Sequence, residues 1–373
     1  MEQHKRPEWV PENGDSQDAF TTSVMKGSAQ LPAAKRAFRK KAVTIEELEE
    51  GVRNNHRTLL AQAITLMESN AARHQQKAQK LIQRLLPHAG HAIRIGITGV
   101  PGAGKSTFIE ALGTMLCQRG YKVAVLAVDP SSTLTGGSIL GDKTRMEKLV
   151  QHPNAFVRPS PSSGTLGGVN RRTRETLLVC EAAGYNVILV ETVGVGQSEG
   201  SVRDMVDFFL LLTLTGAGDE LQGIKRGILE LVDGIVINKA DGDNIIRAQQ
   251  TVALYKQMSR LFLPATDGWE TYVGACSALH CQGLEEFWYA VQQFQDTIAA
   301  AGILEKRRNA QKRNWLYASI REQLEQRFFD HPFIKERLAL AENAIANGTQ
   351  TVTSAALQLM DDYDRFQRST DRP

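Results

Sequence analysis

The sequence predicts an α/β fold in which helices flank a mostly parallel central sheet, with a helical segment added at each end. Two observations support this fold. Between residues 91 and 302, short apolar segments alternate with helical ones, and strands of such apolar density are typical of a parallel sheet that is covered on both faces. On either side of this region, the apolar residues instead follow the i, i+3, i+4, i+7 spacing of amphipathic helices.

Length and charge exclude several classes of protein. The chain has 373 residues, with 44 Lys and Arg against 41 Asp and Glu, and at roughly 150 residues per domain it is long enough for two or three domains. A net charge of +3 creates no strong field for a polyanion, so we expect no nucleic-acid partner. No apolar run reaches about 18 residues, so we expect no contact with a membrane. No signal peptide is apparent, and a cytoplasmic location is expected.

The first 90 residues predict a mobile tail followed by a helical cap. Residues 1–42 are rich in Pro, Gly, Ser, Gln and charged residues, which bury too little apolar surface to offset the entropy of ordering. Residues 44–47 (Thr-Ile-Glu-Glu) form a capping box that predicts the start of a helix. The helical segment, residues 43–90, then carries two apolar stripes before Pro87 and Gly90 end it. The stripes are Leu60, Ala63, Ile64 and Met67, and Ala78, Leu81, Ile82 and Leu85.

The central region, residues 91–302, is predicted to be one domain that contains the sheet. Its strands are expected where short runs of branched and aromatic apolar residues stand between helical segments. They are Ile93–Thr98, Val123–Val128, Val187–Val190, Val206–Leu214 and Ile235–Ile237.

The remaining residues, 303–373, are predicted to form a C-terminal helical arm. Its amphipathic helices need an apolar surface against which to bury their stripes. That surface is either the parent domain or a second copy of the chain, and the pattern leaves both open. The stripes are Leu316, Ile320, Leu324 and Phe328, then Ile334, Leu338, Ala341 and Ile345, and finally Ala356, Leu357 and Met360.

The strongest motif begins where the first predicted strand ends and fits the pattern G-x-x-x-x-G-K-[ST]. Its glycines let backbone N–H groups converge on phosphates, and the N-terminus of the next helix adds its dipole. Lys105 is expected to reach the β- and γ-phosphates, and the Ser106 hydroxyl to bind Mg²⁺. The predicted nucleotide-binding residues here are Gly99, Val100, Pro101, Gly102, Ala103, Gly104, Lys105, Ser106 and Thr107.

A second motif follows the third predicted strand. Glu191 stands at the carboxyl end of that strand, which is where P-loop enzymes hold Mg²⁺, often through a water molecule. Most G proteins have Asp at this position, and the longer Glu side chain suits a contact through water. Gly194 would let its N–H approach a γ-phosphate, which makes this segment a candidate switch.

The third motif predicts specificity for guanine. Asn238, Lys239 and Asp241 give N-K-x-D after the last predicted strand. The Asp241 carboxylate can accept hydrogen bonds from N1–H and from the exocyclic amine of guanine, and adenine offers neither donor. Such a mismatch can cost about 10⁴-fold in selectivity. Asn238 is expected to orient the loop, and Lys239 to lie against the base. The backbone of Ser277, Ala278 and Leu279 is expected to read the guanine O6.

The order of these motifs indicates a P-loop GTPase with GTP or GDP as ligand and Mg²⁺ as metal. An ATPase or a small-molecule kinase would share the first motif but has no need of the third. A phosphotransferase nevertheless stays open as an alternative.

The segments between the motifs resemble a particular group of GTPases. The resemblance is closest to the MeaB/ArgK-type G-protein chaperones, which include the methylmalonic aciduria type A protein and belong to the SIMIBI class. It extends from about residue 55 to about residue 330. The matching segments are residues 127–146, 158–161, 164–168, 191–199 and 218–227.

The resemblance implies further site residues. Asp129 and Asp142 would act around Mg²⁺ and the attacking water, with Ser106 and Glu191 as the other metal-binding residues. Residues 218–227 look like the family's third switch, in which Lys225 would be drawn towards the nucleotide. Together with Lys105, Asp129 and Glu191, Lys225 would be catalytic.

The resemblance also implies function and partners. GTP hydrolysis in the family gates the loading of adenosylcobalamin into an acyl-CoA mutase, most commonly methylmalonyl-CoA mutase, and protects that mutase. A cobalamin adenosyltransferase would be a second partner, and the arm would make a homodimer. Hydrolysis is expected to be slow until the mutase stimulates it, because no arginine finger is evident. A nickel-inserting GTPase is a further alternative, although the sequence offers no convincing Cys/His cluster for it.

Overall fold

The computed structural model describes residues 43–69, 71–128, 146–158, 166–192, 199–216 and 226–370. The chain divides into two units, Met1–Val43 and Thr44–Pro373, and every element named below belongs to the second. The predicted mobile tail, residues 1–42, lies outside the described residues, so it stays a prediction.

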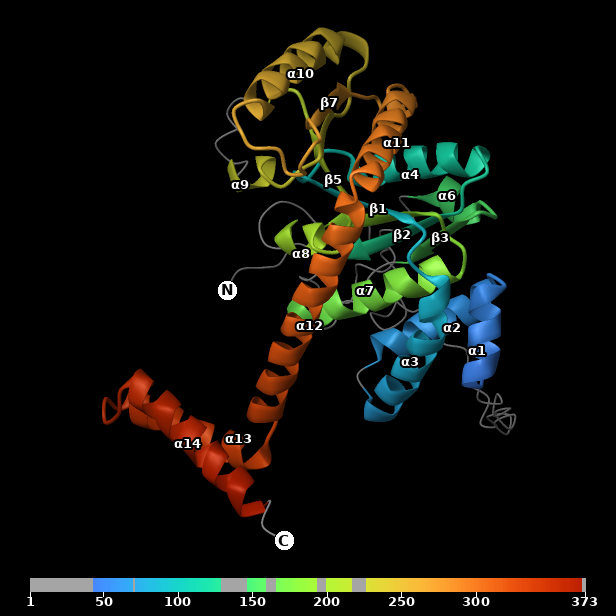
Figure 1. Ribbon diagram of the computed structural model, residues 1–373. Coiled ribbons are helices and arrows are strands. Elements are labelled where there is room, and N and C mark those ends of the chain that lie inside the picture. Colours follow the sequence, from blue (N-terminus) through green and yellow to red (C-terminus); the bar gives the residue numbers. More distant parts are fainter. Residues whose placement is uncertain are drawn as a thin grey trace, which may run out of the picture. The chain divides into compact units, whose positions relative to one another are not determined.

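A sheet of seven parallel strands forms the centre of this unit, in the order β3-β2-β4-β1-β5-β6-β7 (Figure 1). The predicted parallel α/β fold is therefore confirmed. The strands are β1 (Ile93–Gly99), β2 (Val123–Val128), β3 (Ala155–Arg158), β4 (Val187–Thr192), β5 (Phe208–Thr213), β6 (Gly234–Ile237) and β7 (Tyr272–Ala275).

The two edge strands, β3 and β7, were not predicted from the sequence. Each has only four residues, and most of their side chains are only partly buried. A short edge strand is covered on fewer sides than a central one, so it does not need a continuous apolar run. The five central strands were predicted within two residues at each end.

Helices cover both faces of the sheet. One face packs against α4 and α11 through an aromatic core, in which Phe108 meets Phe287 and Phe208 meets Phe294 in edge-to-face geometry. On the other face, α7 and α8 lie against the strands, and α12 (Ile303–Phe329) packs on α7 and α11 (Figure 1). The helices of this domain are α4 (Lys105–Gln118), α6 (Glu147–Gln151), α7 (Leu166–Ala182), α8 (Glu199–Arg203), α9 (Arg226–Leu229), α10 (Ile245–Ser259) and α11 (Leu284–Ala300).

Three N-terminal helices, α1 (Ile45–Arg53), α2 (Arg57–Glu68) and α3 (Ala72–Leu85), pack on one another and on α7. The predicted capping box is confirmed, because the Glu47 N–H donates to Thr44 Oγ1 at 3.1 Å and the Thr44 N–H donates to the Glu47 carboxylate at 2.8 Å. Arg57 fastens α2 to the edge of the sheet by donating to the carbonyls of His152 and Ala155, both at 2.6 Å.

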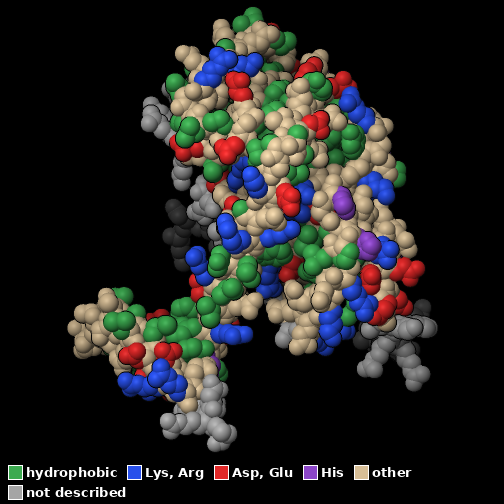
Figure 2. All heavy atoms as spheres, in the orientation of Figure 1, with side chains coloured by type: hydrophobic (Ala, Val, Ile, Leu, Met, Phe, Trp, Pro, Cys, Tyr) green, Lys and Arg blue, Asp and Glu red, His purple; other side chains and the backbone are tan. Residues whose placement is uncertain are grey.

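The C-terminal helices are α12 (Ile303–Phe329), α13 (Pro332–Ala346) and α14 (Val352–Thr370). Only the beginning of α12 is fastened to the sheet. Arg308 donates to both Asp207 carboxylate oxygens at 2.9 and 2.7 Å, and Gln311 Nε2 donates to the carbonyl of Val206 at 2.8 Å. Further along, Leu316 and Leu324 are each 59% exposed, and Figure 2 shows hydrophobic side chains along α12 and on the α13–α14 pair. This stripe therefore does not pack back on the parent domain.

A network of arginines and buried acids lies at the amino-terminal ends of β5 and β6. Asp233, which precedes β6, is fully buried. Its carboxylate accepts hydrogen bonds from both terminal nitrogens of Arg203 in α8, from the Phe209 N–H at 2.9 Å and from the Thr266 hydroxyl. The network thus joins α8, two strands and the loop that precedes β7.

Replacing Asp233 by alanine is expected to lower the free energy of unfolding by about 3–5 kcal/mol, because it leaves the Arg203 side chain, which is only 12% exposed, without its carboxylate. The matched control is Asp330→Ala, which removes an exposed ion pair with Lys335 and is expected to cost at most about 1 kcal/mol. Urea unfolding followed by circular dichroism gives both values. Equal losses in the two variants would contradict the structural role of the network.

Within the described residues, no helix is both long enough and apolar enough to cross a membrane.

Candidate nucleotide-binding site

The predicted motifs meet at one edge of the sheet because they follow β1, β4, β6 and β7, four strands that run in the same direction. In open parallel sheets, ligands bind at the carboxyl ends of the strands. The P-loop motif lies between the end of β1 at Gly99 and the start of α4 at Lys105, as the sequence predicts.

The loop between β1 and α4 has the backbone conformation that its glycines were expected to supply. Gly102 and Gly104 have φ angles of +80° and +85°, which residues with a Cβ rarely adopt. A Cβ at Gly104 would also lie 2.7 Å from Asn238 Nδ2. Gly104 is the N-cap of α4, so the helix begins directly at the loop and directs its dipole towards it.

Lys105 is held inside this loop. Its side chain is 9% exposed, and Nζ donates to the carbonyl of Gly99 at 2.9 Å and to that of Val100 at 3.3 Å. Burial lowers the pKa of the Lys105 ammonium from its ordinary value, and the nearby Glu191 carboxylate opposes this shift. An ammonium in this position can bind the phosphates that the loop surrounds.

Ser106 and Glu191 form the other polar pair of the site. The Ser106 hydroxyl donates to Glu191 Oε1 at 3.0 Å, although the two residues come from α4 and β4. Glu191 lies opposite Ile97 in the ladder of β1 and β4, which places its carboxylate at the loop. A hydroxyl and a carboxylate side by side are hard oxygen ligands of the kind that Mg²⁺ prefers, so these residues fit the expected metal.

Asn238 connects the phosphate loop with the loops expected to bind the base. Its Nδ2 donates to the carbonyl of Ala103 at 2.8 Å, and its Oδ1 accepts from the Ala278 N–H at 3.1 Å. The Cys276 thiol also donates to Oδ1, at 3.4 Å. Burial raises the pKa of Cys276 to about 12, so the thiol keeps the proton that it donates. The predicted orienting role of Asn238 thus has a geometric basis.

Asp241 and Ser277 meet across the two base loops, where the Ser277 hydroxyl donates to Asp241 Oδ2. Lys239 lies between Asn238 and Asp241 with a φ of +58° and has an exposed side chain. Leu279, at the end of the Ser277–Leu279 segment, is 75% exposed.

Three of the predicted site residues, Asp129, Asp142 and Lys225, lie outside the described residues, and their roles stay predictions. One residue that the structure brings into the base loops, Asn244, was not predicted from the sequence. Asn244 donates from Nδ2 to the carbonyl of Lys239 at 2.7 Å. Its position three residues after Asp241, at the start of a helix, is the one signal that could have indicated it.

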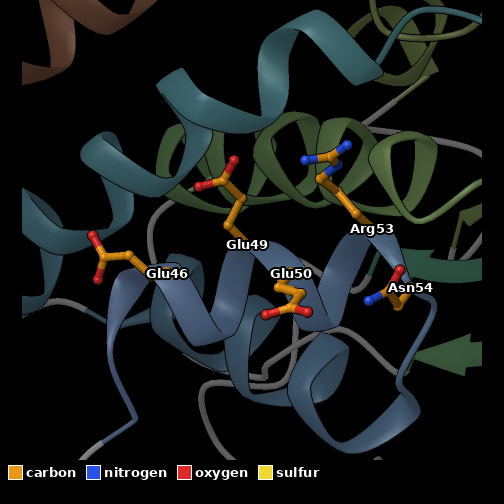
Figure 3. Close-up of a pocket in the computed structure, with 5 residues that line it drawn as sticks. All are labelled: Glu46, Glu49, Glu50, Arg53 and Asn54. Atoms are coloured by element: carbon orange, nitrogen blue, oxygen red, sulfur yellow. The ribbon is translucent and has the colours of Figure 1, made fainter.

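A separate hollow lies beside α1 and is lined by charged and amide side chains (Figure 3). Glu46 and Glu49 in its wall form ion pairs with Arg84 at 2.8 and 3.3 Å. All its lining residues come from α1 or its C-terminal end, and none belongs to a nucleotide motif, so we do not assign the nucleotide to it. They are Glu46, Glu49, Glu50, Arg53 and Asn54.

Comparisons with known proteins agree with this geometry. The profile of the family described as methylmalonyl Co-A mutase-associated GTPase MeaB matches residues 60–332, which include every motif of the site. A probable GTPase of Mycobacterium bovis is 49% identical over 318 residues, which cover 85% of this chain and 95% of the relative. The mitochondrial methylmalonic aciduria type A homolog of Mus musculus is 45% identical over 322 residues, which cover 84% of this chain and 78% of the relative.

A solved structure supports the same assignment. The crystal structure of a LAO/AO transport system kinase superposes with a TM-score of 0.69 at 38% identity, and the match covers 87% of this chain and 99% of that chain. The extent of the family match and the identity to relatives that are named as GTPases identify both the fold and the activity. This chain belongs to the MeaB family of methylmalonyl-CoA mutase-associated GTPases, and it is a GTPase.

Proposed function

We propose that this GTPase is a chaperone that gates the loading of adenosylcobalamin into an adenosylcobalamin-dependent acyl-CoA mutase, methylmalonyl-CoA mutase, and protects that enzyme. The family description names this mutase as the associated protein. The observation that carries the nucleotide part of the proposal is Asn238, whose amide joins the phosphate loop at Ala103 to the base loop at Ala278. One bound GTP would then contact the phosphate loop with its phosphates and the base loop with its guanine.

In the proposed site the chain's own residues bind and orient GTP. The Lys105 ammonium would neutralise charge on the β- and γ-phosphates. The Asp241 carboxylate would accept hydrogen bonds from the N1–H and the exocyclic amine of guanine. Ser106 and Glu191 would hold Mg²⁺, with Asp129 and Asp142 completing the set. When bound, Mg²⁺ supplies positive charge to the phosphate oxygens.

Catalysis in this site would consist of positioning and charge neutralisation. Asp129 and Asp142 would act on the attacking water, beside the Mg²⁺ that Glu191 helps to hold, and Lys225 would approach the nucleotide when the mutase is bound. We propose that hydrolysis is slow in the isolated protein and that the mutase stimulates it by ordering the switch segments.

The test is a capture experiment with purified methylmalonyl-CoA mutase. The immobilised GTPase is loaded with GDP or with a non-hydrolysable GTP analogue, and the bound mutase is measured after washing. We expect capture that depends on the nucleotide, and we expect added mutase to raise the rate of GTP hydrolysis. Capture in neither state, together with an unchanged rate, would contradict the mutase assignment. A cobalamin adenosyltransferase, added as a third component, tests the second proposed partner.

The arm is proposed to form a homodimer. The exposed apolar residues of α12, among them Leu316, Ile320 and Leu324, support this proposal because they lack cover from the described part of their own chain. Light scattering of the Ile320→Asp variant should show a smaller mass than that of the wild type, whereas Arg321→Asp, a change at the neighbouring exposed residue, should not.

We also propose that the boundaries between the tail, the helical cap, the GTPase domain and the arm lie at residues 42, 90 and 302, and that the protein is cytoplasmic.

A phosphotransferase is the second candidate function, because the solved relative is described as a kinase. Radiolabelled GTP, incubated with candidate small-molecule and protein acceptors, distinguishes the two functions. Transfer of the label to water alone supports the chaperone function, and a labelled acceptor supports the phosphotransferase.

A further inference from the structure

Asn244 lies between two loops at the edge of the sheet and hydrogen-bonds to both. It ends the short helical turn η3 (Gly242–Asn244). Its Nδ2 donates to the carbonyl of Lys239 at 2.7 Å. Its Oδ1 accepts from the hydroxyl of Thr215, also at 2.7 Å. Thr215 stands two residues after the end of β5, so the amide spans the loops that follow β5 and β6.

The orientation of this amide follows from the chemistry of its partners. The Lys239 carbonyl can only accept a hydrogen bond, so it must face the NH₂ group of Asn244. The oxygen of the amide then faces Thr215, whose hydroxyl can donate. Both ends of the side chain are therefore engaged, and a residue with only a donor or only an acceptor could not replace it.

Asn244 stabilises the backbone at Lys239, which has an unfavourable conformation. Lys239 has a φ of +58°, a left-handed conformation that is unfavourable for a residue with a Cβ and persists only where its surroundings enforce it. On one side of Lys239, Asn238 is fixed to Ala103. On the other side, Asn244 binds the Lys239 carbonyl, and its own N–H donates to the carbonyl of Asp241 at 3.0 Å. The carboxylate of Asp241 thus projects from a loop that is held at both ends.

We propose that Asn244 is a positioning residue for guanine specificity, which acts by holding the loop that carries Asp241, with Thr215 as its anchor. The inference rests on the proposed role of Asp241 in binding the base. It predicts that removing either hydrogen bond weakens the discrimination that Asp241 provides without altering the phosphate loop.

The test compares the dissociation constants of GDP and inosine diphosphate, which differ only in the exocyclic amine that Asp241 is proposed to bind. We expect wild type to prefer GDP and Asn244→Ala to reduce this preference by about 3- to 10-fold, the range of one or two ordinary hydrogen bonds. Thr215→Val keeps Asn244 and the shape of the threonine side chain but removes the hydroxyl, and it should reduce the preference for GDP by about 2- to 5-fold. The matched control is Thr251→Val in α10, whose hydroxyl donates within its own helix to the carbonyl of Arg247 at 2.8 Å, and it should leave the preference unchanged.

A purely structural role would weaken both nucleotides equally and leave their ratio intact. In an Asp241→Ala background, where the reading carboxylate is gone, Asn244→Ala should change the ratio no further. An unchanged ratio in both Asn244→Ala and Thr215→Val would overturn the inference while the wild-type preference stands. If Asn244→Ala fails to fold, the ratio of the two dissociation constants in Thr215→Val alone tests the inference. A wild type that does not prefer GDP to inosine diphosphate would instead refute the proposed role of Asp241.

Discussion

Replacing Lys105 by alanine is expected to lower kcat/KM for GTP hydrolysis by at least about 100-fold. The Lys105 ammonium is buried in the loop between β1 and α4, with Nζ 2.9 Å from the carbonyl of Gly99. In the proposed site it is the one described side chain with a positive charge inside that loop, so its loss leaves developing charge on the γ-phosphate without a direct counter-charge. Phosphate release over a range of GTP concentrations measures the effect.

The control for this variant is Lys256→Ala, which removes an exposed lysine of α10 and should leave hydrolysis unchanged. Thermal unfolding checks that both variants are folded. A folded Lys105→Ala variant with kcat/KM within threefold of the wild-type value would show that the phosphates bind elsewhere.

The same lysine predicts a pH dependence of nucleotide binding. Burial lowers the pKa of Lys105 in the described site, with Glu191 opposing the shift, whereas bound phosphates would favour the charged form and raise the pKa. Binding should therefore take up a proton at pH values between the two pKa values, and affinity should fall as the pH rises through that range. Below the lower pKa, the lysine is charged in both states and contributes no pH dependence. Calorimetry in buffers of different ionisation enthalpy measures the proton uptake, which Lys105→Ala should abolish.

Replacing Asp241 by asparagine is expected to exchange guanine for xanthine as the preferred base. Guanine presents two donors to this position, N1–H and the 2-amine, and the carboxylate accepts both. Xanthine keeps N1–H but has an oxygen at position 2, so an amide with one acceptor and one donor matches it. Discrimination between a matched and a mismatched hydrogen-bonding site reaches about 10⁴-fold, and a shift of at least about 100-fold in the ratio of the two affinities is expected.

The measurement is the dissociation constant of GDP and of xanthosine diphosphate for each protein. Asp243→Asn is the matched control, because it makes the same chemical change at an exposed residue two positions away, and it should leave the preference for GDP intact. An Asp241→Asn variant that still prefers GDP as strongly as the wild type would mean that another residue reads the base.

Much of the fold was predictable because the signals for it are local. The central strands are continuous apolar runs, and the fully buried pattern of β4 and β5 is the reason for that composition. The capping box of α1 also depends on neighbouring residues only. The strands β3 and β7 were missed because they lie at the edges of the sheet, where four partly buried residues are enough.

The sequence by itself determined that this chain is a P-loop GTPase, because each motif is a short run and their order along the chain is diagnostic. Only the tertiary structure decided how those runs cooperate. The bond from Asn238 to Ala103 joins residues 135 positions apart, and Arg308 reaches Asp207 across 101 positions. The structure also shows that the stripe of α12 is exposed and that Asn244 spans two loops. Contacts of this kind depend on how strands are ordered in the sheet, and no local pattern encodes that order.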